Sequence, residues 1–202
     1  MKLPPVGVGR LAALVLVLLG ACSSGGPDRS ASGGAPPRTR EALVREFGAE
    51  VERLGLRITR AGLVERLGAS GYDEDGRHLA VYVEPTGPLD IGGYVANVDR
   101  LAKVFLPKAF NRLAQIDSFD VCQEPPPGVD DREQPTVMTQ LLVNRSQAQA
   151  IDWQAIRLEH MLAASFREPE AIKVGVATQV RASPAWKQAF TEAQLALRPR
   201  GP

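Results

Sequence analysis

The sequence predicts an α+β fold: one mainly antiparallel sheet of about five strands, with helices packed on one face and the order α-β-β-α-β-β-α-β-α. Three observations predict it. Short segments of alternating apolar residues end at Gly, Pro or Asp turns. Longer segments with apolar residues at helical spacing lie between them. The segment 38–202 is long enough to form one hydrophobic core but too short for two, so we expect a single globular domain there.

The first half of this domain reads as a helix, two strands and a long helix. The expected ranges are a helix over 39–54, strands in the first part of 56–67 and over 77–84, and a helix over 91–114. Gly55 supplies a stop for the first helix, and Asp90 is the expected N-cap of the second. Pro107 lacks an amide hydrogen, so it is expected to kink that helix or to start another.

The second half repeats this alternation. The expected ranges are strands over 118–124 and 136–144, a helix over 146–167, a strand over 171–180 and a last helix opened by Ser183. Ser146 followed by Gln149 has the spacing of a capping box. Ser183 followed by Pro184 combines a good N-cap with a proline at the first helical position.

The amino-terminal segment has the pattern of a secretory signal peptide. Lys2 and Arg10 precede ten residues without a charge, 11–20, which as a helix would rise only about 15 Å, too short to span a bilayer. The next residues, Leu19-Gly20-Ala21-Cys22, resemble the lipobox of bacterial prolipoproteins. That resemblance implies a diacylglyceryl group on the Cys22 thiol and cleavage before it, so that 1–21 is a lipoprotein signal peptide.

Residues 22–37 are expected to be the lipidated cysteine and a flexible Gly/Ser/Pro tether. The stretch after Cys22 contains no large apolar side chain, so it cannot bury enough surface to offset the entropy of ordering. Fifteen such residues span on the order of 20 Å. The sequence therefore predicts an extracytoplasmic protein that is held at a membrane by its amino-terminal lipid.

The charge balance bears on partners. Removing 1–21 takes away Lys2 and Arg10, which leaves 22 basic against 23 acidic residues and a net charge of −1. A nucleic-acid binder needs a basic field, so nucleic acid is not an expected partner. The membrane is expected to be contacted through the lipid, not through a polybasic patch.

Few residues have the pattern of a catalytic or metal site. His78 and His160 are far apart, and no HxxxH or CxxC spacing occurs, so neither a metal nor another cofactor is expected. With Cys22 lipidated, Cys122 is the remaining thiol. It is read as a small buried hydrophobe, with a nucleophile or an intermolecular disulfide as the alternative.

Two glutamates end strands in the same way. Glu84 and Glu124 are each followed by proline, and a carboxylate pair would arise if the two strand ends lay together. The simpler interpretation is that proline stops the strands and that glutamate faces water.

The helix expected over 146–167 suggests a partner surface. Ile151, Ala155, Leu158, Leu162 and Phe166 form its core stripe, which leaves Trp153, Arg157 and His160 on the opposite side. An exposed Trp beside an Arg is typical of binding hot spots. The alternative is that the last helix, led by Trp186, covers this face and buries Trp153.

Three classes of function remain open. The first is a non-catalytic, lipid-anchored envelope protein that binds another envelope component. The second is a carrier for an apolar small ligand, with a cavity lined by residues such as Phe105, Phe110 and Leu141. The third is a hydrolase that uses scattered carboxylates. The absence of a recognisable catalytic motif favours the first, and the sequence identifies neither ligand nor partner.

Overall fold

The computed structural model describes residues 39–69, 71–129, 136–148, 151–167, 169 and 171–198. The expected signal peptide, Cys22 and the tether lie outside the described residues. The described elements are α1 (Arg40–Glu52), β1 (Leu56–Val64), β2 (His78–Pro85), α2 (Ile91–Arg112), β3 (Ser118–Gln123), β4 (Thr139–Asn144), α3 (Arg145–Ala148), α4 (Leu158–Arg167), β5 (Ile172–Val176), α5 (Thr178–Ala182) and α6 (Pro184–Leu197). The predicted α+β class and approximate element order are confirmed.

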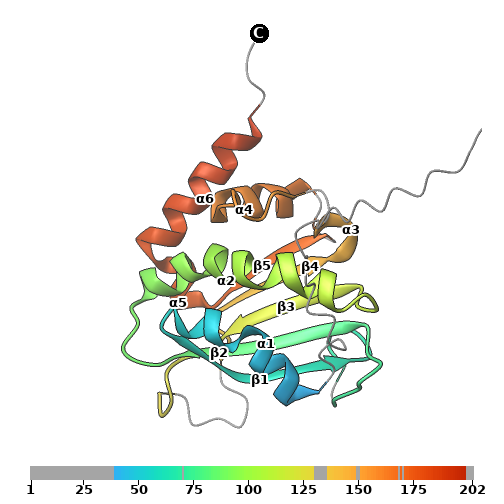
Figure 1. The fold of residues 1–202 in the computed structure, drawn as a ribbon. Coiled ribbons are helices and arrows are strands. Elements are labelled where there is room, and N and C mark those ends of the chain that lie inside the picture. The colour runs from blue at the N-terminus through green and yellow to red at the C-terminus, as the bar shows by residue number, and fades with distance from the viewer. Residues whose placement is uncertain are drawn as a thin grey trace, which may run out of the picture. The chain divides into compact units, whose positions relative to one another are not determined.

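The strands form one five-stranded sheet whose spatial order follows the chain, β1-β2-β3-β4-β5. Three neighbouring pairs are antiparallel, as expected, and the sheet is mixed because β2 and β3 are parallel. The cause is α2, which carries the chain back across the sheet between these two strands (Figure 1).

The helices cover one face of the sheet, and the core lies beneath them (Figure 1). Along β2, Leu79, Val81 and Val83 are fully buried, whereas Ala80, Tyr82 and Glu84 between and after them are half-buried. The ring of Phe105 in α2 lies 4.9 Å from that of Phe47 in α1, measured between centroids, and 5.4 Å from that of Phe119 in β3. These aromatic contacts join both helices to the middle of the sheet.

Two predicted helix starts are confirmed in atomic detail. A carboxylate oxygen of Asp90 accepts a hydrogen bond from the amide of Gly93 at 2.7 Å, at the start of α2. The hydroxyl of Ser183 accepts from the amide of Trp186 at 3.2 Å, with Pro184 at the first turn of α6. The helix α2 continues through Pro107 as one element of 22 residues.

The single helix expected over 146–167 is wrong. The chain forms the short α3, leaves helical geometry, and begins α4 only at Leu158. Within the gap, the indole nitrogen of Trp153 donates to the carbonyl oxygen of Ala148 at 2.7 Å. A carboxylate oxygen of Asp152 accepts from the amide of Gln154 at 3.1 Å. The carbonyl of Ala148 and the amide of Gln154 are thus bonded to side chains, whereas in a continuous helix they would bond to other backbone groups.

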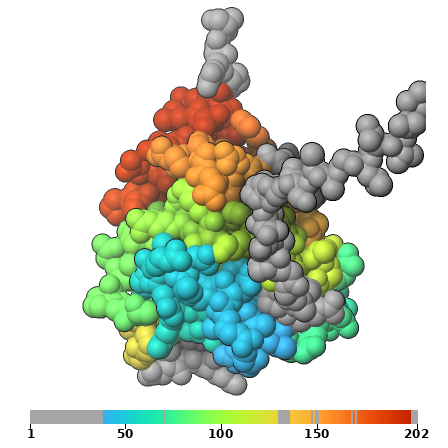
Figure 2. Space-filling model, in the orientation of Figure 1, coloured from blue at the N-terminus to red at the C-terminus, as the bar shows by residue number. Residues whose placement is uncertain are grey.

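The last two helices complete the layer at the β5 end of the sheet. Figure 2 shows α6, α4, α2 and α1 in succession across this face of the molecule, from red through orange and green to blue. The strand expected over 171–180 ends at Val176, after which α5 begins. The carbonyl oxygen of Met138 accepts from the amide of Ala177 at 3.0 Å, which ties the strand end to the segment before β4.

Candidate functional site

The face of the sheet opposite the helices carries polar side chains, and we call it the polar face. An irregularity between Ile58 and Arg60 shifts the register of β1 by one residue. Arg57 and Arg60, which a regular strand would point to opposite faces, therefore both meet the polar face. Its other members are Tyr82 and Glu84 of β2, His78 at the start of β2, Ser118, Asp120 and Cys122 of β3, Glu124 just after β3, and Gln140 of β4.

Glu84 and Glu124 lie at the same end of the sheet, one step beyond the register pair of Val83 and Gln123. The amide of Glu124 donates to the carbonyl oxygen of Val83 at 2.8 Å. Each glutamate also has its own cation: Arg57 pairs with Glu84, and Arg60 pairs with Glu124. The hydroxyl of Thr59 donates to the second carboxylate oxygen of Glu124 at 2.8 Å. The two strand ends therefore lie together, and each carboxylate is held by an arginine.

A hydrogen-bonded cluster lies in the middle of the polar face. The imidazole Nδ1 of His78 lies 2.8 Å from the hydroxyl oxygen of Ser118, and its Nε2 lies 3.0 Å from a carboxylate oxygen of Asp120. The other carboxylate oxygen of Asp120 accepts from the side-chain amide of Gln140 at 2.6 Å and from the thiol of Cys122 at 3.5 Å. His78 is 1 % exposed and Asp120 is 3 % exposed. Both ring nitrogens and both carboxylate oxygens therefore have partners inside the fold.

Cys122 lies near the end of β3 and is buried, as the sequence predicts. Burial, and after it the neighbouring Asp120 carboxylate, raise the pKa of the Cys122 thiol far above its ordinary value. The protonated thiol is a poor nucleophile. This environment is that of a structural cysteine.

Of the three residues of the expected partner surface, one is buried and two are exposed. Trp153 is 6 % exposed, so it is buried, as the alternative expected. The helix that was to carry it is absent, and its indole contacts Ala148 of α3. Arg157 is exposed and pairs with Glu159 at 2.6 Å. His160 is exposed in the first turn of α4. An exposed Trp–Arg pair is not formed at this place.

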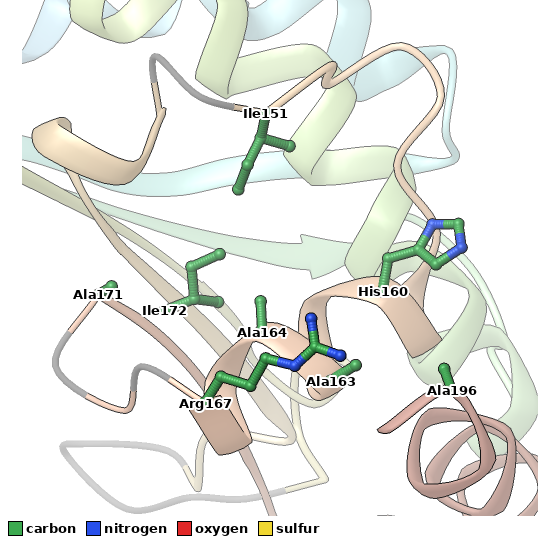
Figure 3. A pocket seen from close by; sticks show the side chains of 8 residues that line it. All are labelled: Ile151, His160, Ala163, Ala164, Arg167, Ala171, Ile172 and Ala196. Carbon is green, nitrogen blue, oxygen red and sulfur yellow. The ribbon is translucent and has the colours of Figure 1, made fainter. Parts of the chain in front are cut away.

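His160 instead borders a small cavity of about 330 Å³ (Figure 3). Its polar lining residues are His160 and Arg167, at the two ends of α4. Figure 3 shows Ile151 and Ile172 on opposite sides of the space, with Arg167 reaching along the helix beside Ala164. The apolar lining residues are Ile151, Ala163, Ala164, Ala171, Ile172 and Ala196.

A larger cavity, which we call the aromatic cavity, lies where α4, β5 and α6 meet. It is open to solvent and has a volume of about 500 Å³. The rings of Phe166 and Phe190 meet edge to face, with their centroids 5.2 Å apart. Phe166 is 41 % exposed, unusually open for a large apolar side chain. The apolar lining residues are Leu162, Phe166, Val174, Val176, Trp186 and Phe190.

The polar part of the aromatic cavity is cationic. Arg181 and Lys187 line it together with the hydroxyl residues Ser165 and Thr191, and the lining contains no Asp or Glu. Among the residues that the structure describes, no carboxylate lies within ion-pair distance of Arg181 or Lys187. A ligand with an apolar part and an anionic group fits this lining.

This cavity is not predicted from the sequence. Trp186 and Phe190 fall on one face of the last helix by spacing alone. Leu162 and Phe166 fall on one face of α4 as expected, but Phe166, which was expected in the core, is 41 % exposed and lines the cavity. Phe105, Phe110 and Leu141, named for an apolar cavity, are instead packed in the core.

Further observations concern metals and membranes. Within the described ranges, no group of three or more His, Cys, Asp or Glu side chains is placed to hold a metal ion. The helices of the described part are all too short or too polar to cross a membrane.

A comparison with protein-family models, curated proteins and solved structures found no match to the chain.

Proposed function

We propose that the chain is a lipid-anchored cell-envelope protein, attached to a membrane through Cys22, whose folded body binds another envelope component without catalysis. The lipobox-like Leu19-Gly20-Ala21-Cys22 and the Gly/Ser-rich stretch that follows support the anchoring part of this proposal. The lipid fixes the amino terminus at the membrane surface, and the tether gives the folded body reach.

One observation carries the binding part of the proposal. The carboxylates at the end of the polar face are paired with arginines, Glu84 with Arg57 and Glu124 with Arg60. His78, which lies between Ser118 and Asp120, is 1 % exposed and so is closed to a substrate. The accessible hollows at α4 have apolar walls with cations at their edges. Such concave, mainly apolar sites with a few polar groups are typical of ligand binding.

The anchor is tested with the two cysteines of the chain, because each serves as the control for the other. Cells that express the wild type, Cys22→Ser or Cys122→Ser are grown with an alkyne analogue of palmitate, and the protein is then assayed for label and for its membrane fraction. We expect label and membrane association in the wild type and in Cys122→Ser, and neither label nor processing in Cys22→Ser. A labelled, membrane-bound Cys22→Ser protein would contradict the proposal.

A carrier for an apolar ligand is the second candidate, and the aromatic cavity favours it. A carrier and an anchored binding protein differ in what they do with a bound molecule, but both require a site with the same chemistry.

A further inference from the structure

Four elements contribute side chains to the aromatic cavity. Val174 and Val176 come from the edge strand β5, Phe166 from α4, and Trp186 and Phe190 from α6. Arg181 of α5 and Lys187 in the first turn of α6 also line it, and both are exposed. The cavity thus combines apolar side chains with two cations that reach solvent.

We infer that the aromatic cavity binds a single acyl chain that ends in a carboxylate, with the chain against Phe166, Trp186 and Phe190 and the carboxylate held by Arg181 and Lys187. This inference names the ligand class for the binding function proposed above and rests on it. Carboxylate is the complement of the two cations, because charge-assisted hydrogen bonds from Arg and Lys are roughly twice as strong as neutral ones.

The apolar lining argues for a flexible hydrocarbon rather than a sugar or a peptide. The hydroxyls of Ser165 and Thr191 are the remaining polar side chains of the lining, and both are already engaged. The hydroxyl of Thr191 donates to the carbonyl oxygen of Lys187 at 2.8 Å, and that of Ser165 donates to the carbonyl oxygen of Leu162 at 2.9 Å. A ligand rich in hydroxyls or amides would find few free partners among these side chains, and burying unpaired polar groups is unfavourable. The cavity volume of about 500 Å³ is within the usual range for small ligands.

The cavity contains its own spectroscopic reporter. The chain has two tryptophans, and Trp186 lines the aromatic cavity, whereas Trp153 is buried against Ala148 and is not part of its lining. Laurate is titrated into the full chain carrying Cys22→Ser, which removes the lipid site and no residue of the cavity. The alcohol and the trimethylammonium of equal chain length are titrated in parallel. Tryptophan emission and equilibrium dialysis are recorded together.

We expect saturable laurate binding that changes the emission of Trp186, weaker binding of the alcohol, and the weakest binding of the cation. In Trp186→Phe the emission change should disappear while dialysis still detects laurate. Arg181→Gln and Lys187→Gln should each weaken laurate binding about tenfold and leave binding of the alcohol unchanged. Arg157→Gln removes an exposed cation outside the lining and should change neither.

Three results would overturn the inference: no saturable binding of laurate, equal binding of laurate and the cation, or unchanged laurate binding in both Arg181→Gln and Lys187→Gln. Because the titration uses a protein without its lipid, such a result leaves the lipid anchor standing. Conversely, loss of label or of membrane association bears on Cys22 and not on this cavity.

Discussion

The Nε2 atom of His78 lies 3.0 Å from a carboxylate oxygen of Asp120, and both side chains are almost completely buried on the polar face. The two residues come from neighbouring parallel strands, where Ser118 is the register partner of His78. The imidazole therefore bridges two side chains of β3, Ser118 and Asp120. The sheet thereby places a closed polar network at its centre.

Asp120→Ala should lower the free energy of unfolding by about 3 kcal/mol, since it leaves buried donors of His78, Gln140 and Cys122 without an acceptor. Urea denaturation measures the change. Asp117→Ala is the matched control, because Asp117 pairs with Arg77 at the exposed surface and its loss should leave the midpoint nearly unchanged. Equal effects of the two substitutions would mean that the buried cluster does not stabilise the fold.

Cys122 should react with iodoacetamide only when the protein unfolds. An ordinary cysteine has a pKa of about 8.5 and becomes a thiolate near that pH. The raised pKa of Cys122 keeps its thiol protonated well above this pH. The labelling rate of the full chain with Cys22→Ser is measured from pH 7 to pH 9, in buffer and in denaturant. Rapid labelling of the native protein that increases with pH would show an accessible, reactive thiol instead.

Trp153→Ala should destabilise the fold by about 3–5 kcal/mol, because it empties a buried site and removes the donor to the carbonyl of Ala148. Arg157→Ala, in the same segment between α3 and α4, should have little effect, since its ion pair with Glu159 is exposed on the arginine side. Thermal melts of the two variants provide the comparison. A stable Trp153→Ala protein would restore the surface interpretation of this tryptophan.

Gly76 should tolerate no side chain. A Cβ atom at this position would lie 2.3 Å from the carbonyl oxygen of Val64, a contact with backbone that cannot move aside easily. Gly76→Ala should therefore cost about 1–3 kcal/mol of stability. Gly87→Ala is the control, because a Cβ atom there would meet nothing within 4 Å beyond its own chain neighbours. Comparable stability of the two variants in urea denaturation would contradict the close approach.

Local signals predict much of the fold. Asp90 and Ser183 are recognisable as N-caps because capping depends on neighbouring residues, and both are confirmed. The alternation in β2 also predicts which side chains face the core. The parallel pairing of β2 with β3 follows from a crossover, which the helix between them indicates but which strand patterns alone do not.

The functional features are harder to predict because they depend on contacts between distant segments. The break before α4 lies where the indole nitrogen of Trp153 donates a hydrogen bond to the carbonyl oxygen of Ala148. The contacts of Glu124, His78 and Asp120 on the polar face depend on the irregularity near Arg60 and on the register of neighbouring strands. The aromatic cavity joins Phe166 of α4 to Trp186 and Phe190 of α6, a juxtaposition that no spacing within one segment reveals.

The mass of the amino-terminal peptide, measured on protein purified from membranes, tests the proposed lipid anchor most directly. The account predicts that the mature chain begins at Cys22 and carries a diacylglyceryl group on its sulfur, with 1–21 removed. An unmodified Cys22 thiol, or a mature chain that still contains residues 1–21, would contradict it.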